Sequence, residues 1–139
     1  SGGYFDGGWA TDTTRTFYGG STEKPNPKMM EMYTLTLKGT LAVQSAVFPE
    51  GTKGMVLDGL ARAAMRKKGY DYNHGTGHGV GVHVHEPGVR LSSISTVPMK
   101  PGQVVSIEPG IYVPGFGGVR LENIAWVENY KNMEILKYF

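Results

Sequence analysis

All four histidines of this 139-residue chain lie within twelve residues, in the glycine-rich run H-G-T-G-H-G-V-G-V-H-V-H-E that begins at His74. Because glycine is unfavourable inside helices, the Gly-Thr-Gly between His74 and His78 places both side chains on a loop or a strand. Histidine is the commonest metal ligand and titrates near neutral pH. Such a cluster indicates an active site, and a solvated polar face is the alternative that the residues leave open.

Composition excludes several classes of protein. The chain has 14 Lys and Arg against 12 Asp and Glu, a formal net charge of +2, so it lacks the strong basic footprint of a nucleic-acid-binding protein. It has no cysteine, which excludes disulfides and thiolate metal sites. No apolar run approaches the roughly 18 residues of a membrane span, and we expect no signal peptide. We therefore expect no membrane contact and a cytoplasmic location.

Two helices are predicted in the first half of the chain. The first begins at Asn26 or Pro27 and ends near Phe48, where Pro49 and a glycine follow. The second runs from about Lys53 to Lys68 and stops at Gly69. The first helix passes through Met29, Met30, Tyr33, Leu37, Leu41 and Ala42, and Met29, Met30 and Met32 are expected to fill the core.

The remaining segments have the pattern of strands. β-branched and aromatic residues around Gly7-Gly8 predict a hairpin within residues 4–18. After His74 we expect strands at 103–108, 119–127 and 133–139, where apolar runs or alternation are found. The sequence thus predicts one domain that mixes helices with an antiparallel sheet.

Three carboxylates accompany the histidines. Asp12 lies between threonines in the first hairpin, Glu108 ends an apolar strand, and Glu122 lies inside an alternating one. Acidic residues seldom occupy buried strands unless they are paired or metal-bound, although an exposed strand face would explain each of them alone. One Asp, one His and two Glu without sulfur favour Mn²⁺, Co²⁺ or Zn²⁺. Several carboxylates can also bridge two ions about 3.5–4 Å apart, as in two-metal hydrolases.

Other motifs fail on inspection. The glycine run from Gly75 to Gly81 lacks the last glycine and the acidic partner of a dinucleotide fingerprint. Gly51-Thr52-Lys53-Gly54 lacks the rest of a phosphate loop. No Gly-x-Ser-x-Gly elbow is present, which excludes the usual serine hydrolase signature.

Five motifs give the chain a specific resemblance over essentially its whole length. They are T-D-T-T-R-T-F at Thr11–Phe17, H-G-T-G-H-G-V-G at His74–Gly81, V-H-E at Val84–Glu86, E-P-G-I-Y at Glu108–Tyr112 and R-L-E-N at Arg120–Asn123. In this order they resemble the C-terminal part of the catalytic domain of the Xaa-Pro aminopeptidase, prolidase and methionine aminopeptidase metallopeptidases. The resemblance implies an α+β pita-bread (creatinase/aminopeptidase) fold, with a curved, mostly antiparallel sheet and helices on one side. Residues 1–139 would form only part of it.

The resemblance also implies roles for individual residues. Each role is carried over from the matching motif position. His83 matches no functional position and is interpreted as a channel wall or a structural residue. The implied metal ligands are Asp12, His78, Glu108 and Glu122, the implied catalytic residues are His74, His85 and Glu108, and the implied supporting residues are Arg120 and Tyr112.

At one place the chain departs from the family pattern. The family has a further metal-binding aspartate about eleven or twelve residues before Asp12, and that position would fall just before Ser1. Asp6 is a poor substitute because it lies beside the hairpin turn. The first half of the domain, with another active-site histidine, would also lie outside the chain.

The implied activity is hydrolysis of the bond before proline in a peptide whose second residue is proline. Two divalent ions, most simply Mn²⁺, would activate a water and polarise the carbonyl. Glu108 would accept the water's proton, His85 would donate to the oxyanion, and His74 would hold the proline side. The family implies a homo-oligomer, or completion by the N-terminal half of the domain. The alternatives are a non-catalytic module that binds peptide or protein, an inactive fragment, and a creatinase-like hydrolase.

Overall fold

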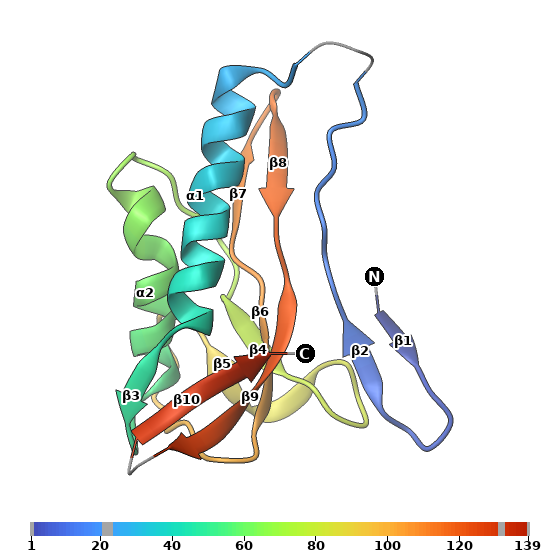
Figure 1. Ribbon diagram of the computed structural model, residues 1–139, viewed down its shortest axis with the longest axis vertical. Helices are drawn as coiled ribbons and strands as arrows, with labels where there is room; N and C mark the ends of the chain where they lie inside the picture. The colour runs from blue at the N-terminus through green and yellow to red at the C-terminus, as the bar shows by residue number, and fades with distance from the viewer. Residues whose placement is uncertain (1, 21–23, 131–132, 139) are drawn as a thin grey trace.

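The computed structural model describes residues 2–20, 24–130 and 133–138. Two helices, α1 and α2, pack side by side against one side of a six-stranded antiparallel sheet (Figure 1). The N-terminal hairpin lies on the side of the molecule away from the helices. The helices are α1 (Pro27–Gln44) and α2 (Gly54–Arg66). The strands are β1 (Gly2–Tyr4), β2 (Ala10–Asp12), β3 (Val47–Pro49), β4 (Gly77–Gly79), β5 (Glu86–Leu91), β6 (Val104–Ile107), β7 (Gly110–Val113), β8 (Gly117–Arg120), β9 (Asn123–Tyr130) and β10 (Met133–Tyr138).

The main sheet has the order β3-β10-β9-β6-β4-β5, and all its neighbouring pairs are antiparallel. Among the described strands, β1 pairs only with β2, and β7 only with β8. One apolar cluster fills the space between the main sheet and the helices, and a second lies beneath the β7–β8 hairpin. This α+β architecture with an antiparallel sheet confirms the predicted fold class. Among the described residues, no helix is both long and apolar enough to cross a membrane.

The N-terminal hairpin confirms the predicted turn at Gly7-Gly8, but its first strand begins at Gly2, before the predicted range of 4–18, and its second ends at Asp12. Gly7 and Gly8 both have positive φ angles, 98° and 84°, which residues with a Cβ rarely adopt. The turn they form lets β1 and β2 pair in the register Gly2↔Asp12. The hairpin therefore ends at Asp12, the first of the implied ligands.

The first helix differs from its prediction at its C-terminal end. It begins as expected, with the Asn26 side chain capping the backbone N–H of Lys28, but it ends at Gln44 and not near Phe48. Phe48 is buried in β3, opposite Glu134 of β10. Because Phe48 precedes proline, the α conformation is disfavoured for it, and the segment extends instead.

The predicted core face of α1 is also partly wrong. Met32 is fully buried and Met29 packs against the second cluster, but Met30 is 54% exposed. Tyr33, Leu37 and Leu41 are exposed as well. The buried face includes small residues where α1 approaches α2 closely: a Cβ on Gly39 would lie 2.4 Å from the carbonyl oxygen of Ala61.

The second helix follows its prediction within two residues at each end, and Gly69 has the positive φ of a helix stop. The basic run after it begins at Arg66 in the last turn, where a cation is favourable. The predicted single strand at 119–127 is wrong, since β8 ends at Arg120 and β9 begins at Asn123. At this junction the chain passes from the β7–β8 hairpin into the main sheet, and Glu122 instead forms an isolated bridge with Thr14.

Candidate metal centre

His78 lies at the centre of a cluster of carboxylates. It occupies the middle of β4, between β5 and β6. The flanking glycines allow this close packing, because a Cβ on Gly77 would lie 1.8 Å from the carbonyl oxygen of Ser106. The glycine-rich run is thus required by the sheet as well as by the loop that precedes it.

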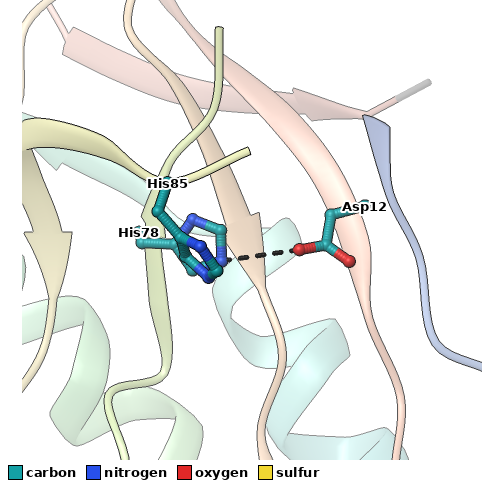
Figure 2. A group of neighbouring side chains, drawn as sticks. All are labelled: Asp12, His78 and His85. Carbon is teal, nitrogen blue, oxygen red and sulfur yellow. Dashed lines mark ion pairs between the residues drawn. The ribbon is translucent and has the colours of Figure 1, made fainter. Parts of the chain in front are cut away.

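Two carboxylates face the same nitrogen of His78. Its Nε2 lies 3.1 Å from Oε1 of Glu108 and 3.6 Å from Oδ2 of Asp12, and Figure 2 shows Asp12 directed at the imidazole. Its Nδ1 lies 3.0 Å from the carbonyl oxygen of Gly79. Because a carbonyl can only accept, Nδ1 carries the hydrogen and the neutral ring presents a lone pair at Nε2. A proton or another cation is then needed between Nε2 and the carboxylates.

Glu122 adds a third carboxylate, and it is 2% exposed. Its Oε2 accepts a hydrogen bond of 2.5 Å from the hydroxyl of Thr14, and its backbone N–H donates to the Thr14 carbonyl. Its Oε1 is buried and has no hydrogen-bond partner among the residues that the structure describes. An unpartnered buried carboxylate oxygen is costly, so the environment of this atom fits a cation-binding role.

The potential ligand atoms form two overlapping groups that share His78. One contains Asp12, His78 and His85, the other His78, Glu108 and Glu122, and within each group the atoms lie within 4.8 Å of one another. The His85 ring lies beside that of His78, with centroids 4.2 Å apart (Figure 2). Asp6 is exposed in the first turn and belongs to neither group.

Electrostatics confirm that the cluster is short of positive charge. Burial lowers the pKa of His78, but the hydrogen bond to Glu108 and the charges of Glu108 and Asp12 outweigh it and leave that pKa raised. Burial raises the pKa of Glu108, yet the hydrogen bond and charge of His78 leave it lowered. Burial raises the pKa of Glu122, and the charges of Glu108 and Asp12 raise it further. The hydrogen bond from Thr14 lowers it, but the pKa remains raised overall.

The supporting residues form a hydrogen-bond chain beside the cluster. Arg120 donates from Nη1 to the Tyr112 hydroxyl at 3.2 Å, so that hydroxyl donates onward to Nε2 of His74 at 2.9 Å. The Nδ1 of His74 donates to the Gly75 carbonyl at 2.7 Å. Both ring nitrogens of His74 therefore have protein partners. Arg120 also reaches Thr14 from Nε, at 3.4 Å, which links it to Glu122.

The cluster opens into a pocket of about 1080 Å³. All the residues implied as ligands line it, together with His74, His85 and Arg120. His83 is exposed and does not line the pocket, and its backbone N–H donates to Oε1 of Glu86.

Sequence reasoning missed two groups of residues around the site. Thr14 and Ser106 hold the carboxylates Glu122 and Glu108, respectively. Asp58 and Arg62 form a buried ion pair on α2. Their spacing of four residues among the apolar positions of the predicted helix was the signal that could have revealed this pair.

Comparisons with known proteins bear on this arrangement. The sequence model for metallopeptidase family M24 matches residues 1–129. A probable Xaa-Pro aminopeptidase P from Sclerotinia sclerotiorum is 48% identical over 130 residues, which are 90% of this chain and 21% of that relative. A relative of the same description from Sordaria macrospora is 49% identical over 134 residues. The chain thus spans about a fifth of the length of these curated relatives.

Solved structures agree with the family match. The chain superposes on an X-prolyl aminopeptidase from Caenorhabditis elegans, described as a cytosolic enzyme with a di-nuclear active site, with a TM-score of 0.86 at 35% identity. That match covers 94% of this chain and 22% of the nematode chain. Prolidase from Pyrococcus furiosus gives a TM-score of 0.82 at 35% identity, over 94% of this chain and 36% of the prolidase. The fold is therefore the expected pita-bread fold, over a part of those structures.

Proposed function

The chain belongs to metallopeptidase family M24, and from that premise we propose that residues 1–139 are the C-terminal portion of the catalytic domain of a dinuclear metal-dependent Xaa-Pro aminopeptidase. The substrate would be a peptide with proline in second position. The observation that carries the proposal is the buried Oε1 of Glu122, which has no hydrogen-bond partner among the described residues, in a side chain grouped with His78 and Glu108 as potential metal ligands. The relatives' description as Xaa-Pro aminopeptidases supports the substrate class.

The donor set fits divalent metal ions. His78 would bind through Nε2, and Asp12, Glu108 and Glu122 would bind through carboxylate oxygens. Such oxygen-rich sites suit Mn²⁺, with Co²⁺ and Zn²⁺ as alternatives. When bound, the ions would supply a water of lowered pKa and a polarised carbonyl. Two ions agree with the di-nuclear description of the nematode relative. That relative's description as cytosolic supports a cytoplasmic location.

The chain's own residues would do the rest of the chemistry. Glu108 lines the pocket with its carboxylate 3.1 Å from Nε2 of His78, so it can accept a proton from the attacking water and pass it to the leaving nitrogen. His85 is exposed at the pocket, where it can donate to the developing oxyanion. Because both nitrogens of His74 are engaged, it would contact the proline side of the substrate through its ring face.

The first test is to count Mn²⁺ ions bound by the metal-stripped chain, using calorimetry with elemental analysis. We expect at least one ion in the His78 cluster. Two ions per chain would mean that both positions form from these residues, and a single ion would assign the second position to groups beyond residues 1–139. Binding of no divalent ion at millimolar concentration would overturn the proposed centre.

The second test addresses catalysis through Glu108→Gln, which keeps the shape of the side chain and removes its basicity. We expect Xaa-Pro peptide hydrolysis by the Mn²⁺-loaded protein to be abolished. Glu128→Gln is the matched control, because Glu128 is exposed and pairs only with Lys137 among the described ion pairs. Near-normal kcat in the Glu108 variant would refute its role. Peptide binding without any hydrolysis by the unaltered protein would favour a non-catalytic module.

A further inference from the structure

A second charged network lies on the buried side of α2 and borders the same pocket, and the proposed chemistry does not use it. Arg62 engages all five of its N–H groups. Two go to the Asp58 carboxylate at 2.8 and 3.0 Å, and one goes to Asp71 at 2.6 Å. The other two go to the backbone carbonyls of Tyr72 and His74, both at 2.7 Å. The guanidinium also stacks on the Tyr72 ring, 3.8 Å from its centroid.

Three of these five bonds end on one loop. Asp71, Tyr72 and His74 belong to the segment that joins α2 to β4, and His78 lies four residues further along. A buried ion pair contributes little net stability, because the cost of desolvating both charges offsets most of their attraction. Its bidentate geometry does orient its partners strictly. The network is therefore better suited to fixing the path of this loop than to strengthening the core.

Thr76 connects this network to Glu108. Thr76 is 0% exposed, and its hydroxyl donates to Oδ1 of Asp58 at 2.7 Å. Because that hydroxyl has a single hydrogen, the Tyr72 hydroxyl must donate to it. The Thr76 backbone carbonyl accepts the N–H of Glu108 at 2.7 Å. One residue thus touches helix α2 through its side chain and the Glu108 backbone through its carbonyl.

Ser106 links His78 directly to Glu108 through its side chain. Its hydroxyl accepts the backbone N–H of His78 at 3.0 Å and donates to Oε1 of Glu108 at 3.1 Å. Glu108 is consequently held at its backbone by Thr76 and at its carboxylate by Ser106. His78 is held at its backbone by Ser106 and through the loop by Arg62.

We propose that Thr76 is a positioning residue, through which Asp58 and Arg62 of α2 set the placement of Glu108 relative to His78. Neither Thr76 nor Asp58 lines the pocket, so neither would touch the ion or the peptide. The inference rests on the proposed function only in treating His78 and Glu108 as ligands of one centre.

The test compares Thr76→Val with Thr40→Val. Both substitutions remove one buried threonine hydroxyl with little change of shape, and Thr40 lies on α1, where its hydroxyl donates only to the Thr36 carbonyl. We expect Thr76→Val to weaken Co²⁺ affinity by about tenfold, the lower end for residues that orient metal ligands. Thr40→Val should stay within twofold of the unaltered chain. Thr76→Ser keeps the hydroxyl and should restore the affinity.

A metal-free readout separates this inference from the proposed function. Amide hydrogen exchange of Glu108 in the stripped protein should accelerate in Thr76→Val and not in Thr40→Val. If the unaltered chain binds no Co²⁺, the metal centre fails, and the exchange rates still decide the role of Thr76. If Thr76→Val matches Thr40→Val in both affinity and exchange, the inference is overturned.

A milder variant covers the case in which Thr76→Val does not fold. Tyr72→Phe removes only the tyrosine hydroxyl that donates to Thr76. We expect the same changes in Co²⁺ affinity and Glu108 exchange, with smaller size. If Thr76→Val does not fold and Tyr72→Phe leaves both the Co²⁺ affinity and the Glu108 exchange rate unchanged, Thr76 serves only in the core. That result would overturn the positioning role.

Discussion

Two groups of charged side chains border the same pocket, and they differ in how their charge is balanced. In the α2 network, Asp58 and Asp71 face Arg62 and Arg66, and every N–H of Arg62 has an acceptor. In the metal cluster, three carboxylates lie around His78, and one oxygen of Glu122 has no partner among the described residues.

This difference separates a group that organises the protein from one that awaits a ligand. A buried charge must be paired, and a folded chain can supply the partner itself or leave the place for an ion. The α2 network is complete without any ligand, so it can hold the loop before the ligands bind. The cluster is complete only when a cation enters.

Removing the cation of the balanced group should have the largest effect. Arg62→Met leaves Asp58 buried without its partner, and we expect the free energy of unfolding in urea to fall by about 3–5 kcal/mol. Lys137→Met is the control, since its pair with Glu128 is exposed, and it should cost less than about 1 kcal/mol. Equal losses in the two variants would show that the α2 network is no more important than a surface ion pair.

Adding a cation to the unbalanced group should have the next largest effect. Mn²⁺ at 100 times its dissociation constant should raise the free energy of unfolding by about 2.7 kcal/mol, because it binds only the folded chain. Thermal denaturation with and without the ion measures this gain. The gain should be largely lost in Glu122→Gln, which keeps the shape of a ligand and removes its charge. If Mn²⁺, Co²⁺ and Zn²⁺ all leave the thermal denaturation midpoint unchanged, the claim that the cluster needs a cation is contradicted.

The smallest effect concerns pH, where the two groups should respond with opposite signs in metal-free protein. The pKa of Glu122 is raised above 4.5, chiefly by burial, so its contribution to stability is present at low pH and is lost as pH rises through the folded-state pKa. The pKa of Asp71 is lowered below 3.8: burial opposes the shift, but hydrogen bonds from Arg62, Tyr72 and Arg66 prevail. Its contribution is present above 3.8 and is lost as pH falls through the lowered value.

Unfolding free energies across this pH range, measured for Glu122→Gln and Asp71→Asn, check the two signs. In Glu122→Gln the free energy of unfolding should fall less steeply as pH rises above 4.5. In Asp71→Asn it should fall less steeply as pH drops below 3.8. The Asp71 effect should be small because its side chain is 45% exposed and therefore screened. The same slope in both variants would show that the groups do not differ in charge balance.

The two helices show where sequence reasoning succeeds. α2 has one apolar face directed at the sheet and the other helix, so its periodicity and its glycine stop predicted it within two residues. α1 carries large apolar residues on its outer face, while Gly39 and two threonines occupy the contact with its neighbours. Periodicity identified only part of the buried face there, because the close approach to α2 places Gly39 and the threonines beside the buried apolar residues.

By itself, the sequence determined which side chains could form a site: the histidines on a glycine-rich run, the carboxylates at strand ends, and the motif order of the family. Local chemistry also decided the first hairpin and the start of α1, because positive φ at Gly7 and Gly8 and the cap at Asn26 depend on neighbours in the chain. These features require no distant partner.

Only the tertiary structure decided how those side chains meet. Asp12 approaches His78 because the backbone N–H of Ala10 donates to Gly81 across the chain, and Glu122 turns inward where β8 passes into β9 beside Thr14. The role of Thr76 likewise depends on Asp58 and Glu108, which lie far from it in sequence. Such contacts arise from long-range strand pairing and packing, which no local pattern of residue types encodes.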